Sequence, residues 1–216
     1  MRIEVWSDIV CPWCYIGKRR LEKALAAFDH ADEVEVVWRS FQLDPSFARG
    51  SRQPTFEYLA KKFGSSAGEV RTMTDRVKTL AAQDGLAYDF ARATMVNTFD
   101  AHRLTHLAKA HGVGGEMHER LMRAHLIEGE VVDDADTLVR LAAEVGVPTD
   151  EASRVLAGDE YTGDVEGDIQ QARALGVTGV PFFVLDRAYG ISGAQPVEAF
   201  LSALRTAHDQ AGVNAS

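Results

Sequence analysis

The stretch Ser7-Asp8-Ile9-Val10-Cys11-Pro12-Trp13-Cys14-Tyr15-Ile16-Gly17 decides the fold, and it contains the only two cysteines in the sequence. It follows a short apolar strand pattern at residues 3–6 and opens a helix that we expect to run from Trp13 to Phe28. One thiol therefore lies at the N-terminal end of a helix, where free backbone N–H groups and the helix dipole favour a negative charge. Pro12 suits the first helical turn because its missing N–H costs nothing there. The pattern predicts a redox-active dithiol, in which one thiolate attacks a disulfide and the second thiol resolves the mixed disulfide.

Three other interpretations of the cysteine pair remain open at this point. A structural disulfide would close a loop of only two intervening residues and would constrain the unfolded chain very little. A zinc site could combine Cys11 and Cys14 with His102 and His106, which are spaced i, i+4, although this separation is far longer than in a zinc finger. Two inert buried cysteines are the third alternative. We rank the redox role above all three, and we expect Cys11 to be exposed and reactive and Cys14 to be shielded.

Composition and charge limit the class of protein. The chain has 216 residues, of which 46% are hydrophobic and 25% are charged, as in an ordinary globular protein with a full core. Its net charge of −9 argues against general affinity for nucleic acid or for an anionic membrane. No apolar run reaches transmembrane length, and the N-terminus lacks the apolar stretch of a signal peptide. We therefore expect a cytoplasmic protein with neither nucleic acid nor membrane as a partner.

The order of predicted elements indicates one domain that is interrupted by an insertion. A second strand at residues 34–41 completes a βαβ unit, and a loop at residues 43–54 leads out of it. Residues 55–175 have helical patterns almost throughout, with no strand of convincing length. Within this stretch four apolar residues could line a substrate cleft, but we expect them to be ordinary core, namely Phe56, Tyr58, Phe63 and Met73.

Strand character returns only near the C-terminus. Residues 182–185 and 188–192 predict an antiparallel hairpin joined by a two-residue turn at 186–187, and an amphipathic helix follows at about 196–208. The predicted fold class is α/β: a single redox domain with a large all-helical insertion between its βαβ and ββα halves. The redox domain, thioredoxin-like by the resemblance described next, would comprise residues 1–54 and 176–216, and the helical insertion residues 55–175.

The chain resembles the DsbA-like thioredoxin superfamily. It is most similar to the FrnE-like branch, which is related to 2-hydroxychromene-2-carboxylate isomerase and the kappa-class glutathione transferases. The likeness includes residues 7–17, Asn97-Thr98-Phe99-Asp100-Ala101-His102-Arg103, Gly179-Val180-Pro181-Phe182-Phe183 and Ser192-Gly193-Ala194-Gln195-Pro196. It thus covers nearly the whole chain in the right order, and it implies a thioredoxin fold with the dithiol as the reactive centre.

The resemblance also implies roles for individual residues. Cys11 would be the attacking thiol, Cys14 the resolving thiol and Pro181 a cis-proline that faces them. A cis-proline there exposes the backbone N–H and C=O of Val180, with which an extended substrate can pair as if it were an extra strand. Proline also carries no metal-binding atom, which discourages capture of zinc by the nearby thiols.

Further substrate contacts are expected on both sides of the dithiol. Pro12 and Trp13 lie between the two cysteines, where they would tune the dithiol and meet the substrate. In the relatives the segment around Asn97, His102 and Arg103 lies near the active cleft, so these residues could bind a substrate or a glutathione carboxylate. The alternative is a purely structural role, in which Asn97 caps a helix and Arg103 forms a surface ion pair.

These observations favour a thiol–disulfide oxidoreductase or isomerase acting on protein or small-molecule thiols and disulfides. The related isomerase and transferase carry serine at the position of Cys11 and use glutathione, so the second cysteine favours disulfide exchange. A glutathione-dependent isomerase or transferase acting on a small aromatic or polyketide-like substrate is the alternative within the same fold. No bound cofactor or metal is expected, glutathione is a candidate co-substrate, and the sequence is compatible with a monomer or a homodimer.

Overall fold

The central sheet is built from the two ends of the chain. The computed structural model describes residues 1–214, and side chains through Gln210. The strands of the sheet are β1 (Arg2–Ser7), β2 (Glu35–Ser40), β5 (Phe182–Leu185) and β6 (Tyr189–Ser192). Their order is β2-β1-β5-β6, with β2 parallel to β1 and with β5 and β6 antiparallel to their neighbours. This is the thioredoxin topology, so the predicted α/β fold class is confirmed.

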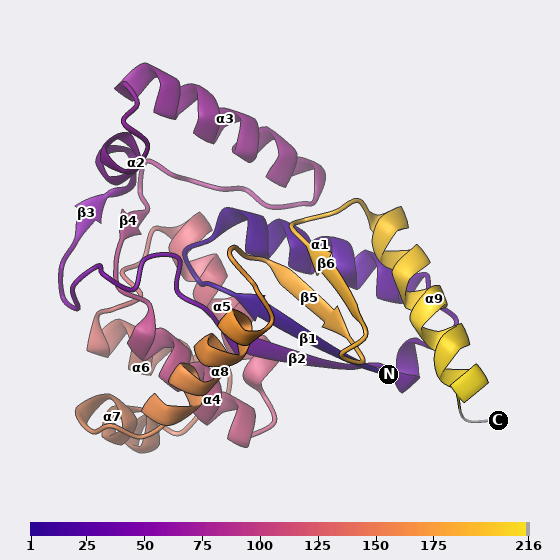
Figure 1. Ribbon diagram of the computed structural model, residues 1–216. Helices are drawn as coiled ribbons and strands as arrows, with labels where there is room; N and C mark the ends of the chain where they lie inside the picture. Colours follow the sequence, from indigo (N-terminus) through magenta and orange to yellow (C-terminus); the bar gives the residue numbers. More distant parts are fainter. Residues whose placement is uncertain (215–216) are drawn as a thin grey trace.

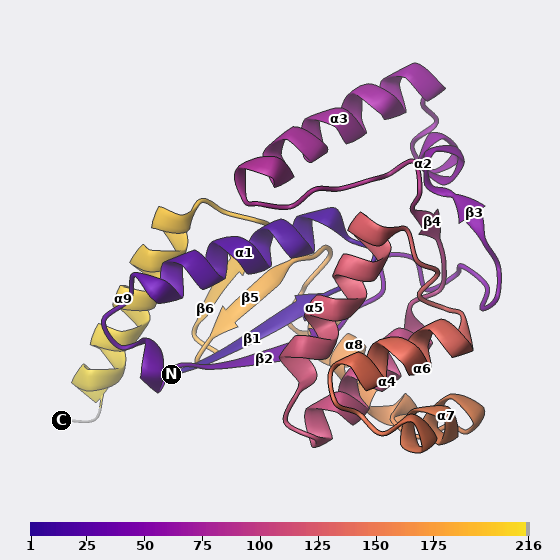
Figure 2. The ribbon, with the colours of Figure 1, turned by 180° about the vertical axis from the view of Figure 1, so that it is seen from behind.

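Helices cover both faces of this sheet, as the alternation along β1 requires. Ile3 and Val5 belong to one core cluster with residues of α1 (Pro12–Ala26) and α9 (Val197–Asn214). Trp6 points to the opposite face, where its indole N–H donates to the Asp168 carbonyl of α8 (Thr162–Ala174) at 2.8 Å. Figures 1 and 2 show α8 and α1 on opposite sides of the strands. Helix α1 is thereby fixed with its N-terminus at the end of the sheet where β1 finishes.

The chain between the two halves of the sheet is mostly helical. Its elements are α2 (Thr55–Phe63), α3 (Ala67–Gln83), α4 (Phe99–Ala110), α5 (Gly114–Arg123), the π-helical segment η2 (Ala124–Glu128), α6 (Ala135–Glu144), α7 (Thr149–Ala157) and α8. It is not entirely helical, because the short strand β4 (Thr94–Met95) pairs with β3 (Gln53–Pro54). Helices α2 and α3 form an arm that lies over α1 in Figures 1 and 2. This arm extends past the N-terminus of α1, where the cysteines lie.

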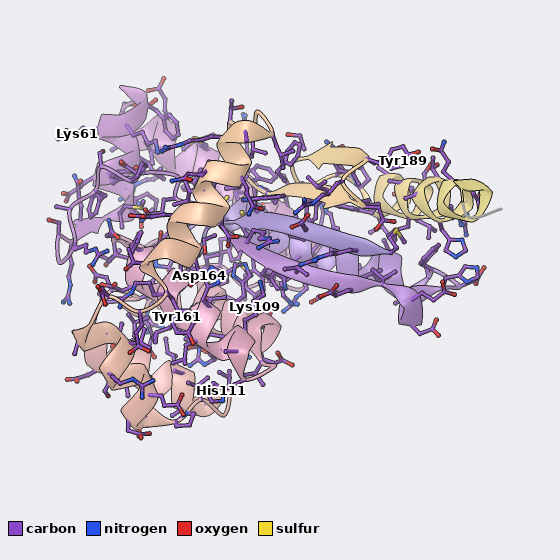
Figure 3. All side chains as sticks on the ribbon, turned by 60° about the horizontal axis from the view of Figure 1, so that its bottom comes forward. Lys61, Lys109, His111, Tyr161, Asp164 and Tyr189 are labelled. Atoms are coloured by element: carbon purple, nitrogen blue, oxygen red, sulfur yellow. The ribbon has the colours of Figure 1, made fainter. Side chains whose placement is uncertain are left out.

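The local predictions agree with the structure except at element ends. Helix α1 ends at Ala26, two residues earlier than predicted, and a 3₁₀ turn η1 (Ala31–Glu33) follows before β2. The hairpin turn contains three residues, 186–188, and not the predicted two, because Leu185 pairs with Tyr189. Asp186 and Arg187 within it have positive φ values of 46° and 57°. In Figure 3, Tyr189 on this hairpin lies toward α9, whereas Tyr161, just before α8, lies toward the helical part.

No helix in the described part of the chain combines the length and the apolar character needed to cross a membrane.

Candidate active site

The two cysteines occupy the first turn of α1. Cys11 is the N-cap residue, and its N–H donates to the Asp8 carbonyl at 3.1 Å, while the Cys14 N–H donates to the Cys11 carbonyl at 3.1 Å. Both thiols are free, and their residues are only 3% and 1% exposed. The expectation of an exposed Cys11 is therefore wrong for this structure, because the loop before β5 and the first turn of α1 cover its side chain. Cys11 nevertheless borders a pocket, which Cys14 does not.

The loop before β5 lies directly against the attacking position predicted from the sequence. The Val180–Pro181 peptide bond is cis, and the Cys11 thiol donates to the Val180 carbonyl with a sulfur–oxygen distance of 3.6 Å. Glycine at position 17 permits this approach, because a Cβ there would lie 3.0 Å from Cγ of Pro181. The structure thus brings Cys11, Val180 and Pro181 together across 169 residues of sequence separation.

The Cys14 thiol lies deeper and in a different environment. Burial, reinforced by the neighbouring Cys11 thiol, raises the pKa of Cys14 well above its usual value, while a hydrogen bond with the Ser7 hydroxyl opposes the shift. The Ser7 hydroxyl also lies 2.9 Å from Nε2 of His118. The His118 ring stacks on Trp38 with a centroid distance of 4.4 Å. Burial, together with His102 and Lys18, holds the pKa of His118 well below its usual value, so this imidazole is neutral near neutral pH.

Two tyrosines stabilise the first turn of α1 from the side. Tyr88 is 1% exposed, and its hydroxyl donates to the Pro12 carbonyl at 2.7 Å. Burial and the nearby Cys11 and Cys14 raise the pKa of Tyr88, so it remains a hydrogen-bond donor. Tyr15 stacks on Tyr88 and donates its hydroxyl hydrogen bond to Glu119 of α5. The Pro12 carbonyl is therefore already hydrogen-bonded within the protein. Trp13, the other residue between the cysteines, is 39% exposed.

An apolar pocket of about 530 Å³ opens beside Cys11. Its lining comes from the first turn of α1, from the arm formed by α2 and α3, from the strand β4 region and from η2. The lining residues are Val10, Cys11, Pro12, Trp13, Leu43, Thr55, Tyr58, Leu59, Lys62, Phe63, Met73, Thr74, Val77, Phe90, Ala93, Met95, His125, Leu126 and Val180.

The large apolar side chains exposed on the arm gather at this pocket. Phe63 is 55% exposed and Met73 is 37% exposed, and both line the pocket together with Trp13. The prediction of ordinary core is therefore wrong for Phe63 and Met73. It is confirmed for Tyr58, which is buried in a core cluster and contributes to the pocket wall as well. Phe56 packs against another core cluster, which contains both cysteines. The sequence could not separate the two cases, because helix periodicity marks an apolar face without showing what covers it.

His125 is a pocket residue that sequence reasoning missed. It lies in η2, a π-helical turn of the kind often found at functional sites, and it is 3% exposed. Burial lowers the pKa of His125 to about 4, so the ring is neutral. Its Nδ1 atom is buried without a hydrogen-bond partner among the described residues. A π-turn has no simple sequence signature, so no sequence pattern indicated this residue.

Asn97 and Arg103, which we expected to contact a substrate, are not among the residues that line this pocket. The Asn97 side chain donates to the Phe47 carbonyl at 2.6 Å and accepts from the Phe99 N–H at the start of α4 at 2.9 Å. Arg103 is 1% exposed, and its guanidinium donates to backbone carbonyls of the α7–α8 connection. Both side chains thus have internal partners. Arg103 does form an ion pair, with Asp100 at 2.9 Å, but it does so from a buried position and not at the surface.

His102 and His106 do not converge with the cysteines. His102 is 1% exposed, and its Nε2 lies 3.3 Å from an Asp8 carboxylate oxygen. His106 faces Ser40 at 3.2 Å and Asp168 at 3.1 Å, on the far side of β2. In the described part of the chain, the cluster of side chains able to hold a metal contains neither cysteine. The zinc site considered from the sequence is therefore not formed.

Known proteins with similar sequences or structures share the fold described above. A family model described as the DSBA-like thioredoxin domain matches residues 2–205. The crystal structure of a probable DsbA oxidoreductase from Streptomyces coelicolor is 47% identical, covers 97% of this chain and 90% of that chain, and superposes with a TM-score of 0.94.

Two more distant solved structures share the fold. The cytosolic disulfide reductase DsbM from Pseudomonas aeruginosa, solved with GSH, is 21% identical with a TM-score of 0.65, covering 95% of this chain and 98% of that chain. A 2-hydroxychromene-2-carboxylate isomerase is 14% identical with a TM-score of 0.71, and both chains are covered completely.

Proposed function

Because this chain belongs to the DsbA-like thioredoxin domain family, we propose that it is a thiol–disulfide oxidoreductase in which Cys11 attacks and Cys14 resolves. The observation that carries the proposal is the position of Cys11. Its sulfur lies 3.6 Å from the Val180 carbonyl oxygen, at the head of an apolar pocket and at the N-terminus of α1. A nucleophile, a backbone docking position and a substrate-sized space therefore meet at one point.

The first step is attack on a substrate disulfide. The Cys11 thiolate forms a bond to one substrate sulfur, the substrate S–S bond breaks, and the other substrate sulfur leaves as a thiolate. The position of Cys11 supports this role, since free N–H groups at a helix N-terminus favour a thiolate there. Attack replaces the hydrogen bond between the Cys11 thiol and Val180, which leaves the Val180 carbonyl free for the substrate backbone.

The second step is resolution of the mixed disulfide. The Cys14 thiolate attacks the Cys11 sulfur, the Cys11–Cys14 disulfide forms, and the second substrate sulfur leaves as a thiolate. The substrate is reduced by two electrons and the protein is oxidised by two. The same steps in reverse transfer the disulfide to a dithiol substrate. Burial keeps Cys14 protonated until then, and the substrate thiolate released in the first step takes up its proton. The Ser7 hydroxyl hydrogen-bonds the Cys14 sulfur and can stabilise its thiolate.

Two features favour a polypeptide as the substrate. Neither backbone polar group of Val180 has a main-chain hydrogen-bond partner among the described residues, so an extended chain can pair there. The exposed side chains of Trp13, Phe63 and Met73 then offer apolar contact area beside the reacting sulfur. We propose a preference for disulfides that are flanked by apolar residues.

A trapping experiment tests the proposal. In a Cys14→Ser variant the mixed disulfide cannot be resolved, so Cys11 should retain its substrates as covalent complexes that dissolve on reduction. Cys11→Ser is the matched control and should trap nothing. Mass spectrometry of the trapped species, combined with insulin reduction by the wild-type protein, identifies the substrate class. Absence of complexes and of insulin reduction would exclude the proposed activity, whereas adducts containing only small molecules would favour the glutathione-dependent alternative.

We also propose glutathione as the thiol that resets the dithiol. The fold supports this, since DsbM, which shares it, was solved with GSH. Turnover of the oxidised protein with glutathione as the sole reductant is the test, with dithiothreitol as the positive control. We also propose a cytoplasmic location, because DsbM, which shares the fold, is described as cytosolic. Fractionation of the host cell tests this location.

A further inference from the structure

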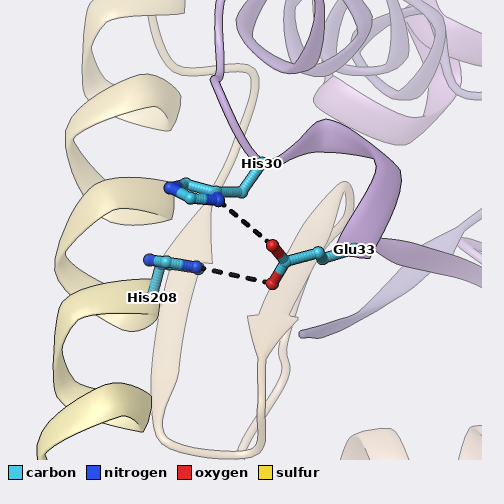
Figure 4. A group of neighbouring side chains, drawn as sticks. All are labelled: His30, Glu33 and His208. Carbon is cyan, nitrogen blue, oxygen red and sulfur yellow. Dashed lines mark hydrogen bonds and ion pairs between the residues drawn. The ribbon is translucent and has the colours of Figure 1, made fainter.

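Far from the dithiol, three side chains capable of binding a metal converge at the opposite end of α1. His30 precedes the 3₁₀ turn η1, Glu33 ends it, and His208 lies on α9. One ligand atom from each lies within 4.8 Å of the other two. Figure 4 shows both imidazole rings directed toward the same carboxylate, from segments separated by most of the chain.

The local fold sets this arrangement. The Glu33 N–H donates to the His30 carbonyl at 3.1 Å, so the 3₁₀ turn places these two side chains on one side. Nδ1 of His30 lies 3.1 Å from one Glu33 carboxylate oxygen, and Nε2 of His208 lies 3.5 Å from the other. The positive N-terminus of Met1 donates to the Glu33 carbonyl at 2.9 Å and fixes the turn from behind.

The same aromatic ring supports both imidazoles. Phe28 is 6% exposed, and it contacts His30 and His208 edge-on at centroid distances of 5.7 and 5.9 Å. The two imidazole rings stack on each other at 3.9 Å. The side chains of His208 and His30 are 29% and 45% exposed, so an ion can reach them from solvent. The site therefore combines a buried aromatic support, Phe28, with ligand atoms that solvent can reach.

We propose that His30, Glu33 and His208 form a surface site for a divalent transition-metal ion of the zinc type. Two imidazole nitrogens and one carboxylate oxygen suit such an ion, and a water molecule would complete a tetrahedral set. Hard cations such as Mg²⁺ and Ca²⁺ prefer sites built only from oxygen and should not bind here.

Binding requires a defined local movement. A coordinated ion lies in the plane of each imidazole, at about 2.0–2.1 Å from the nitrogen. The stacked rings are nearly parallel, with an interplanar angle of 17°, so they must tilt apart to share one ion. The bound ion would connect the turn before β2 to α9 and would stabilise the folded state, because the unfolded chain does not gather these ligands.

Calorimetric titration with ZnCl₂ at neutral pH tests the site. The full chain should carry Cys11→Ser and Cys14→Ser, so that the dithiol cannot bind zinc. We expect one equivalent to bind, the thermal midpoint to rise with zinc concentration, and MgCl₂ to have no such effect. His208→Ala and Glu33→Gln should each weaken zinc binding by more than about tenfold, since even a residue that only orients a ligand costs about that much.

His111→Ala is the matched control. His111 is also a partly exposed histidine that faces a carboxylate, Glu151, at 3.0 Å, but it lies outside the three-residue cluster. This variant should bind zinc like its parent. Absence of saturable zinc binding would overturn the proposal. So would His208→Ala and Glu33→Gln variants that bind zinc as tightly as their parent protein. Because the cysteines are replaced throughout, either result is independent of the oxidoreductase activity.

Discussion

Replacing Arg103 distinguishes a substrate-binding role from a structural one. Its guanidinium donates to the carbonyls of Gly158 at 2.7 Å and Glu160 at 2.8 Å, and also to the carbonyl of Val155. Arg103→Met keeps much of the side-chain volume but leaves the Gly158 and Glu160 carbonyls without their donor, whereas the Val155 carbonyl still accepts from the Gly158 N–H at 3.3 Å. At about 1–3 kcal/mol for each of the two unsatisfied groups, the loss would be about 2–6 kcal/mol. The variant also removes the ion pair with Asp100 at 2.9 Å, so we expect about 3–5 kcal/mol, the usual cost of breaking a buried charged network.

Urea unfolding and thermal melts measure this loss. For a chain of this size about 3–5 kcal/mol corresponds to a fall in the thermal midpoint of roughly 6–20 °C. Arg154→Ala is the control on the same connection, since Arg154 makes an exposed ion pair with Glu160 at 3.0 Å and its removal should change the stability far less than the loss of Arg103. Below the melting range, disulfide-exchange kinetics of the folded Arg103→Met protein should be unchanged. A variant that keeps its stability within about 1 kcal/mol but has a raised KM would refute the structural role.

Three further predictions concern the region around the dithiol. Iodoacetamide should label Cys11 before Cys14 in the reduced protein, because Cys11 borders the pocket while burial raises the pKa of Cys14; equal rates on a mass-spectrometric time course would contradict this. Gly17→Ala should lower exchange activity and cost about 1–3 kcal/mol, because its Cβ would lie 3.0 Å from the proline ring of the loop before β5. Gly68→Ala, which has open space around it, should show no overpacking cost, and equal losses in the two variants would count against the steric explanation. Between pH 7 and pH 4 the free energy of unfolding should fall by up to about 3 kcal/mol because of His125. The pKa of His125 is lowered to about 4 in the folded state, so the unfolded state binds the extra proton as the pH drops below about 6.5. Urea midpoints at both pH values should show a smaller difference in His125→Asn, and an identical pH dependence would exclude this contribution.

The sequence by itself determined the elements that depend on local patterns. The cysteine pair at a helix start, the two flanking strands and the hairpin follow from spacing and residue type within short windows. The order of these elements also predicted that the two ends of the chain share one sheet, because a βαβ unit must bury its faces against the remaining strands, and the resemblance supplied the thioredoxin topology. The resemblance then identified Pro181, and the structure has a cis bond before it.

Only the tertiary structure decided what surrounds the dithiol. Whether Phe63 and Met73 join a core or line a pocket depends on how far the α2–α3 arm extends past α1, and helix periodicity carries no information about that distance. Arginine is a residue type that often binds ligands, but the guanidinium of Arg103 is buried because it donates to carbonyls more than fifty residues away in sequence. His30 and His208 meet for the same reason, since α9 packs back onto the end of α1. Contacts of this range arise from the packing of whole elements, which no short window of sequence encodes.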